Sequence, residues 1–196
     1  MDIPLTDLLL HNRIAMVFFP SLLLSLWLTP VAIRCSFRLN AVDRPDERTV
    51  HRKVVSRMGG AAMVAGLVLP LLFTPLDRTM LAFLAGVFLI AATGFLDDVY
   101  RIPPSAKFVG EIAAAAAFVL LSGLSIREFG DLFCIGEICT GRLGPILTIF
   151  CMVGVMNALN LSDGLDGLAG GISAIACAFL GLFAYLGMEW ASVMIL

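Results

Sequence analysis

Long stretches without a charged residue constrain this chain more than any other feature of its sequence. A helix that crosses the hydrocarbon layer of a membrane needs about 20 mainly apolar residues, with a lower limit near 17. The chain has six uncharged stretches, and five of them reach that length directly. The fourth reaches it only by including Phe108–Glu111, so Glu111 is expected near an interface or facing other helices. The predicted spans are about 14–33, 58–76, 79–96, 108–126, 143–162 and 167–188.

These spans predict an all-α fold, a polytopic transmembrane helix bundle that forms a single integral membrane domain over residues 1–196. The composition agrees, because 60% hydrophobic and 14% charged residues provide too little polar surface for a soluble domain of this length. Residues 193–196 resemble the opening of a seventh span. We therefore expect the domain to be incomplete at its C-terminus.

The distribution of Lys and Arg predicts how the spans are oriented, because cytoplasmic loops carry an excess of these residues. Seven of the thirteen lie in Arg34–Arg57, so this segment is predicted to be cytoplasmic and the N-terminus to be outside. Alternating six spans from there places nine basic residues inside and four outside. The same alternation brings loops 97–107 and 163–166 to the cytoplasmic face.

Each of these two loops carries an acidic motif. Asp97 and Asp98 are predicted to follow the third span as the first residues of loop 97–107. Two adjacent carboxylates at a membrane boundary repel each other and are costly to desolvate, and a divalent cation or a proton relieves that cost. The alternative interpretation is that the pair simply ends the span in water.

The second motif runs from Asn157 to Gly171 and places polar side chains three residues apart. In a straight α-helix, each step of three turns back about 60°, so four such positions would spread over about 180°. That spread is too wide for one small ligand, but Gly164 and Gly167 allow the backbone to break and bring the oxygens together. The alternative is a turn in which the last of these acids is only a helix N-cap. The four polar residues are Asn157, Asn160, Asp163 and Asp166.

Carboxylate and amide oxygens without Cys or His favour Mg²⁺, with Mn²⁺ as an alternative, and argue against zinc. In proteins Mg²⁺ is typically held by one or two carboxylates together with substrate phosphates. The two motifs therefore point to phosphate chemistry.

A basic segment between the first two predicted spans, from His51 to Gly60, forms a third candidate element. Arg57 and its basic neighbours could bind an anionic headgroup or a diphosphate, and Gly59-Gly60 could let backbone N–H groups approach a phosphate. The alternatives are that the charges only set topology and that the glycines are a close helix-packing surface. Lys107 is a candidate phosphate clamp, or alternatively an anchor at the membrane interface.

In order along the chain, Arg57–Gly60, Gly94–Asp98, Lys107 and Asn157–Gly167 resemble the polyprenyl-phosphate N-acetylhexosamine-1-phosphate transferase family. The resemblance extends from about Asp43 to Gly171, and the run Asn-x-x-Asn-x-x-Asp-Gly-x-Asp-Gly is its most specific part. Further similarity at 42–51 and 143–145 favours the UDP-N-acetylglucosamine branch.

The resemblance implies a Mg²⁺-dependent enzyme that transfers N-acetylglucosamine 1-phosphate, or a related sugar 1-phosphate, from a UDP-sugar to undecaprenyl phosphate and releases UMP. This reaction is the first membrane step in making cell-surface polysaccharides such as the O-antigen of lipopolysaccharide. The implied location is the bacterial inner membrane, with several spans and the active site on the cytoplasmic face. The implied partners are the UDP-sugar, undecaprenyl phosphate and membrane lipid.

Carried over by position, the resemblance also implies roles for individual residues. The implied catalytic residues are Asp97, Asp98, Asp163 and Asp166, of which Asp163 and Asp98 would hold the metal. The implied substrate contacts are Asn157, Asn160, Lys107, Arg57 and His51. The particular role of Asp166 stays open, as does the choice between direct transfer and a covalent intermediate. Arg101 occupies a position where some members of the family carry a third acid, so no metal role is assigned to it.

Two other classes of protein remain as alternatives. One is an ion-coupled transporter, although the acids lie at one face instead of the midplane and no inverted repeat is evident. The other is a catalytically incomplete fragment of the transferase. The sequence contains no basic patch with interleaved aromatic residues, so it does not predict nucleic-acid binding. A homodimer is compatible with the sequence.

Overall fold

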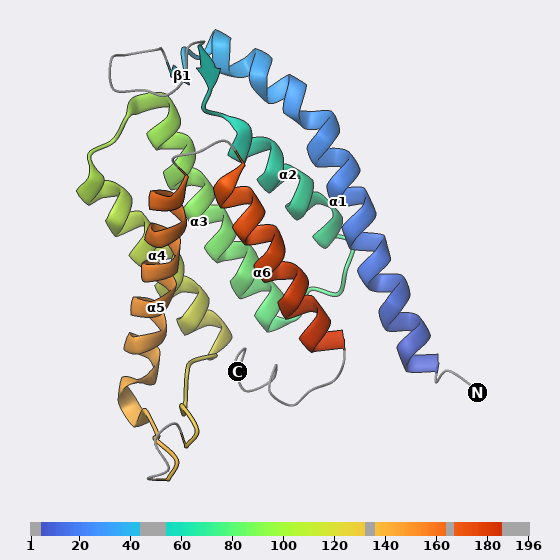
Figure 1. Cartoon of the computed structure of the whole chain (residues 1–196), viewed down its shortest axis with the longest axis vertical. Coiled ribbons are helices and arrows are strands. Elements are labelled where there is room, and N and C mark those ends of the chain that lie inside the picture. The colour runs from blue at the N-terminus through green and yellow to red at the C-terminus, as the bar shows by residue number, and fades with distance from the viewer. Residues whose placement is uncertain (1–4, 44–53, 132–135, 164–166, 186–196) are drawn as a thin grey trace. The chain divides into compact units, whose positions relative to one another are not determined.

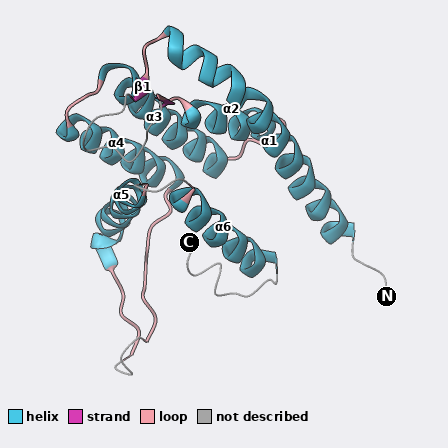
Figure 2. Ribbon diagram, turned by 45° about the horizontal axis from the view of Figure 1, so that its top comes forward, coloured by secondary structure: helices cyan, strands magenta, loops and turns pink. Residues whose placement is uncertain are grey.

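The computed structural model describes residues 5–43, 54–131, 136–163 and 167–185. Six α-helices account for most of this part of the chain (Figure 1). They are α1 (Leu5–Arg38), α2 (Gly59–Leu71), α3 (Arg78–Tyr100), α4 (Pro104–Ser122), α5 (Gly144–Ser162) and α6 (Leu168–Tyr185). A 3₁₀ turn, η1 (Gly141–Leu143), precedes α5, and two short strands, β1 (Val42–Asp43) and β2 (Val55–Ser56), pair antiparallel between α1 and α2 (Figure 2).

Four described segments are long and apolar enough to cross a membrane: Met16–Arg38, Arg78–Tyr100, Pro104–Ser122 and Gly141–Ser162. Large apolar side chains such as Trp27, Phe88 and Phe150 are exposed in them, as expected for surfaces that face lipid. The chain is therefore an all-α membrane protein with one minor sheet among its described residues. The apolar helices Gly59–Leu71 and Leu168–Phe183 are shorter than a full span.

The predicted span 58–76 is wrong at its C-terminal end, since α2 stops after 13 residues at Leu71. Pro75 disfavours helical backbone in the residue before it, and the Thr74 hydroxyl donates to the Leu71 carbonyl (2.6 Å). The next helix begins at once, because the Met80 N–H donates to the Asp77 carboxylate (2.7 Å) as an N-cap. A turn therefore occupies the last part of the predicted span.

Other helix ends also differ from the prediction. Helix α1 extends beyond 14–33, so Arg34 and Arg38 belong to a helix and not to a loop. Helix α4 begins at Pro104, a residue suited to the first helical position, and ends before Gly123, which has φ 76°. This helix therefore lies about four residues earlier than the predicted span 108–126.

Contacts within the chain define two compact units, Met1–Gly110 and Glu111–Leu196. In the first unit, α2 packs along α1, and the buried residues are mostly small. Small residues let membrane helices approach closely, since apolar side chains gain little by leaving lipid for one another. Gly66 is one such position: a Cβ there would lie 2.9 Å from both the Cβ and the backbone nitrogen of Ser25.

Replacing Gly66 with alanine is expected to destabilise the first unit by about 1–3 kcal/mol, because the added methyl group separates α1 from α2. The measurement is the midpoint of thermal unfolding in detergent. Gly154→Ala is the matched control, since Gly154 lies inside α5 and an added Cβ would meet no atom within 4 Å. The control should be neutral or gain up to about 1 kcal/mol from helix propensity. Equal midpoints for the two variants would contradict the close packing of α1 and α2.

Candidate functional site

Asp97 and Asp98 lie in the last turn of α3, not in a loop after it as the sequence predicted. The helix continues through both acids and ends at Arg101, whose backbone is left-handed (φ 52°) and whose N–H donates to the Asp97 carbonyl (2.9 Å). Pro103 and Pro104 follow and prevent the helix from continuing. The two carboxylate side chains are therefore attached to helical backbone.

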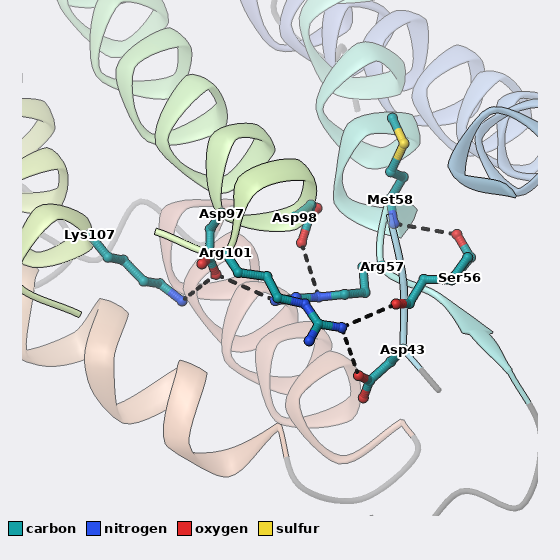
Figure 3. Close-up of polar contacts among 9 residues, drawn as sticks. Asp43, Ser56, Arg57, Met58, Asp97, Asp98, Arg101 and Lys107 are labelled. Atoms are coloured by element: carbon teal, nitrogen blue, oxygen red, sulfur yellow. Dashed lines mark hydrogen bonds and ion pairs between the residues drawn. The ribbon is translucent and has the colours of Figure 1, made fainter. Parts of the chain in front are cut away.

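Arg57 links the two carboxylates (Figure 3). Its Nη2 lies 3.6 Å from Asp97 Oδ2, and its Nε lies 3.8 Å from Asp98 Oδ1. Neighbouring residues on a helix point about 100° apart, so a single flat guanidinium group with several donors is well suited to contact both. One cation thus holds the pair of like charges together.

The short sheet positions Arg57. Val42 pairs with Ser56, and the Arg57 N–H donates to the Ala41 carbonyl (3.1 Å). The next residue, Met58, is buried and its N–H donates to the Ser56 hydroxyl (3.3 Å). The backbone on both sides of Arg57 is therefore fixed, and its side chain extends from the sheet toward the end of α3.

Lys107 completes the cluster from the first turn of α4, with its Nζ 3.7 Å from Asp97 Oδ2. Its backbone N–H donates to the Pro103 carbonyl, which ties this turn to the proline pair before it. The structure thus brings together four of the residues predicted from the sequence, all in the first unit. We call this group the charge cluster: Arg57, Asp97, Asp98 and Lys107.

Two negative and two positive side chains make the charge cluster neutral overall. Its ion-pair distances of 3.6–3.8 Å exceed the 2.7–2.9 Å or so of a direct charge-assisted hydrogen bond. The four side chains remain between 19% and 30% exposed. The carboxylate oxygens therefore keep capacity for a cation, and the two basic groups keep capacity for an anion.

A cavity of about 240 Å³ adjoins Asp98 between α2 and α3. Gly60 and Gly94 are among its lining residues. A Cβ at Gly59, Gly60 or Gly94 would meet no atom within 4 Å, so these are not positions of close helix contact. Within the described residues, no helix packs closely against Gly59 or Gly60.

Arg101 forms a separate contact at the same end of α3. Its Nη2 lies 3.8 Å from Asp43 Oδ1 and donates to the Val42 carbonyl at 3.5 Å (Figure 3). Both charged side chains of this pair are largely exposed. The contact joins the sheet to α3, and so supports the position of Arg57.

The second unit contains the other motif. Asn157 and Asn160 lie on α5, and Asp163 is the first residue after it, with an exposed side chain. The predicted break in the backbone is confirmed at Gly167, which has φ 80° and precedes α6. Asp166 and His51 lie outside the described residues. Within the described ranges, no group of three or more His, Cys, Asp or Glu side chains is placed to hold a metal ion.

Glu111 is a residue of this unit whose partner the sequence did not predict. It is only 2% exposed, on α4, and its Oε2 accepts a hydrogen bond from the Asn157 amide. The same amide group also donates to the Val153 carbonyl (3.0 Å). The available signal was that Glu111 is the one acid within the fourth predicted span, a site where ionisable residues are rare and commonly have partners.

Comparison with known proteins shows which family this chain resembles. Residues 80–196 match the family model for glycosyl transferase family 4, and this range includes both acidic motifs. The chain is 36% identical to a probable undecaprenyl-phosphate N-acetylglucosaminyl 1-phosphate transferase of Bacillus subtilis, over 89% of this chain and 49% of the relative. It is 31% identical to the undecaprenyl-phosphate alpha-N-acetylglucosaminyl 1-phosphate transferase of Yersinia pestis, over 79% of this chain and 43% of the relative.

Another relative, a decaprenyl-phosphate N-acetylglucosaminephosphotransferase of Mycobacterium tuberculosis, is named for a different lipid phosphate. It is 31% identical to the chain, over 88% of this chain and 46% of its own length. The chain thus spans about half the length of the curated relatives it matches, and no solved structure matches it. The family model covers more than half of the chain, and it includes Asp97, Asp98, Lys107 and the motif on α5. The chain belongs to glycosyl transferase family 4.

Proposed function

We propose that this protein transfers N-acetylglucosamine 1-phosphate from UDP-N-acetylglucosamine to undecaprenyl phosphate and releases UMP. In this reaction a lipid phosphate oxygen becomes bonded to the sugar-linked phosphorus, and the bond from that phosphorus to the bridging oxygen of UMP breaks. The names of the Bacillus subtilis and Yersinia pestis relatives support undecaprenyl phosphate as the acceptor and N-acetylglucosamine 1-phosphate as the group transferred. The observation that carries the proposal is the charge cluster at the end of α3.

The charge cluster suits a transfer between two anionic molecules. Phosphoryl transfer depends mainly on alignment and on neutralising charge. In this proposal Arg57 and Lys107 contact the phosphate groups, while Asp97 and Asp98 hold these two basic side chains in position and contribute to metal binding. Asn157 and Asn160 line the pocket for the nucleotide sugar.

Mg²⁺ is the proposed cofactor, with Mn²⁺ as a substitute, and Asp98 and Asp163 are its proposed ligands. The donor set fits this ion, because both side chains offer carboxylate oxygens and both are accessible. When bound, Mg²⁺ would neutralise phosphate charge. Asp163 also lies at the C-terminal end of α5, where the helix dipole disfavours a carboxylate and favours a cation. His51 and Asp166 stay as proposed site residues through the resemblance alone.

The proposed setting is the bacterial inner membrane, with six crossing helices, the N-terminus outside and the site at the cytoplasmic face. The excess of Lys and Arg in Arg34–Arg57 supports this orientation. A site at this boundary would let a water-soluble UDP-sugar meet a headgroup whose tail stays in lipid. The proposed pathway role is the first membrane step of a cell-surface polysaccharide such as the O-antigen.

Membrane vesicles of defined sidedness test the reaction and its location together. Inside-out vesicles containing the protein are expected to release UMP from external UDP-N-acetylglucosamine when undecaprenyl phosphate and Mg²⁺ are present. Sealed right-side-out vesicles should release UMP only after permeabilisation, because the charged nucleotide sugar does not cross the bilayer. Vesicles without the protein give the background. UMP release no higher than background in both preparations would disprove the proposed reaction, and equal release from both sealed preparations would disprove the proposed face.

A further inference from the structure

Glu111 is a buried acid that the proposed reaction has so far left without a role. It lies on α4 in the second unit and is only 2% exposed. Ala114, Ala115 and Val119 are also buried, and their spacing places all four residues along one face of α4. Charged residues are almost never this deeply buried without a partner. The burial of Glu111 therefore depends on the group that it contacts.

That group is the side-chain amide of Asn157 on α5. Its nitrogen donates one hydrogen bond to Glu111 Oε2 and another to the Val153 carbonyl, one turn earlier on the same helix. An asparagine amide has two N–H donors, so these two contacts use both of them. The contact with Glu111 also fixes which way the amide points, because a carboxylate oxygen accepts from the nitrogen and not from the carbonyl.

The orientation leaves the Asn157 carbonyl oxygen as the atom that is available to a ligand. Asn157 is half-buried, so part of its side chain remains accessible. A carbonyl oxygen accepts hydrogen bonds or coordinates a cation, but it has no donor for a phosphate oxygen. Its partner on a bound nucleotide sugar is therefore an N–H or O–H group, such as the uracil N–H or a sugar hydroxyl.

We propose that Glu111 is a positioning residue, which orients the Asn157 amide so that its carbonyl oxygen contacts an N–H or O–H group of the bound nucleotide sugar. The inference rests on the proposed function, because it takes Asn157 to line the nucleotide-sugar pocket. It adds Glu111 as a residue of the site, and it specifies that Asn157 acts as an acceptor.

An exchange of the two polar groups tests this assignment. Asn157→Asp alone places two carboxylates against each other with no donor between them, and is expected to lower kcat/KM for UDP-N-acetylglucosamine by about 100-fold. Glu111→Gln alone keeps an acceptor for the Asn157 amide and should stay within about fivefold of wild type. In the double variant Glu111→Gln/Asn157→Asp, the new amide donates to the new carboxylate. That variant still presents an acceptor oxygen, so it should recover to within about tenfold of wild type.

A truncation separates positioning from general packing. Glu111→Ala removes the group that orients Asn157, and is expected to lower kcat/KM by about 10- to 100-fold. Val119→Ala is the matched control, since it removes buried volume from the same face of α4, about 12 Å further along the helix than Glu111. Thermal midpoints measured beside the kinetics show whether the two truncations disturb folding equally. The expected result is a similar fall in midpoint, with loss of kcat/KM only in Glu111→Ala.

Calorimetric titration with UDP-N-acetylglucosamine provides a second readout that does not need turnover. If wild type binds and releases UMP while the Glu111 and Val119 truncations behave alike, only the inference is overturned. Failure of the double variant to recover relative to Asn157→Asp, in both binding and turnover, would also overturn it. If wild type binds the nucleotide sugar but releases no UMP, the proposed reaction fails and the binding series still decides the inference. A wild-type protein that neither binds nor turns over the nucleotide sugar overturns both.

Discussion

Replacement of Asp163 with asparagine is expected to lower the rate of UMP release by about 1,000-fold, equivalent to about 4 kcal/mol in the activation barrier. A neutral amide binds a hard cation such as Mg²⁺ far more weakly than a carboxylate does. Asp163 directly follows α5 and is exposed at the negative end of that helix, where a cation is favoured. The measurement is the initial rate of UMP release over a range of Mg²⁺ concentrations, and the variant should need more Mg²⁺.

The stability of the same variant provides an independent check. Removing a negative charge from a helix C-terminus is favourable for the helix, so Asp163→Asn should unfold at the same temperature as wild type or higher. Asp77→Asn is the control: asparagine caps a helix as well as aspartate, and UMP release should stay within about twofold of wild type. Near-normal activity in Asp163→Asn would exclude this residue as a metal ligand. A fall in the unfolding midpoint would instead assign the lost activity to misfolding.

The second large effect is expected in the charge cluster. Asp97→Asn and Asp98→Asn should each lower kcat by about 100-fold or more, because each removes a charge that holds Arg57 in position. Asp97→Asn should have the larger effect on KM for UDP-N-acetylglucosamine, since Asp97 also holds Lys107. The measurement is steady-state kinetics of both variants with undecaprenyl phosphate at saturation.

Asp43→Asn is the matched control for these two variants. It also removes a carboxylate that pairs with an arginine near the end of α3, at 3.8 Å from Arg101. Both partners are largely exposed, and exposed ion pairs contribute only about 0–1 kcal/mol. The control should therefore keep kcat within about threefold of wild type. A loss in Asp43→Asn as large as that in Asp98→Asn would show that any carboxylate at this end of α3 matters, and would remove the specific role given to the charge cluster.

The class of fold followed from the sequence because a membrane imposes a local rule. Backbone groups within hydrocarbon have no water to bind and must be hydrogen-bonded within the protein, so a spanning segment can only be a helix or a strand of a closed barrel. The stretches around α3 and α5 therefore predicted helices close to those observed. The break at Gly167 was also predictable, since glycine adopts positive φ at little cost. The family, too, was evident from the sequence, because each of its motifs is a short run of neighbouring residues.

The exact ends of the helices were harder to predict from the sequence, because turns and caps of only two or three residues determine where a helix ends. The short α2 depends on Thr74 and Pro75, and the continuation of α3 through Asp97 and Asp98 depends on the left-handed backbone of Arg101. Hydropathy does not detect such features, because they change backbone geometry without changing average polarity.

Contacts between elements were decided by the tertiary structure alone. Arg57 contacts Asp97 and Asp98 because a two-stranded sheet places its backbone beside the end of α3, forty residues further along the chain. Glu111 contacts Asn157 because α4 and α5 present these two side chains to each other. An ion pair or a hydrogen bond forms only at the right distance and direction, and local sequence does not set the distance between separate helices. The sequence by itself therefore determined the membrane class, the family and the candidate residues, while the packing of the helices and the sheet decided which of those residues meet.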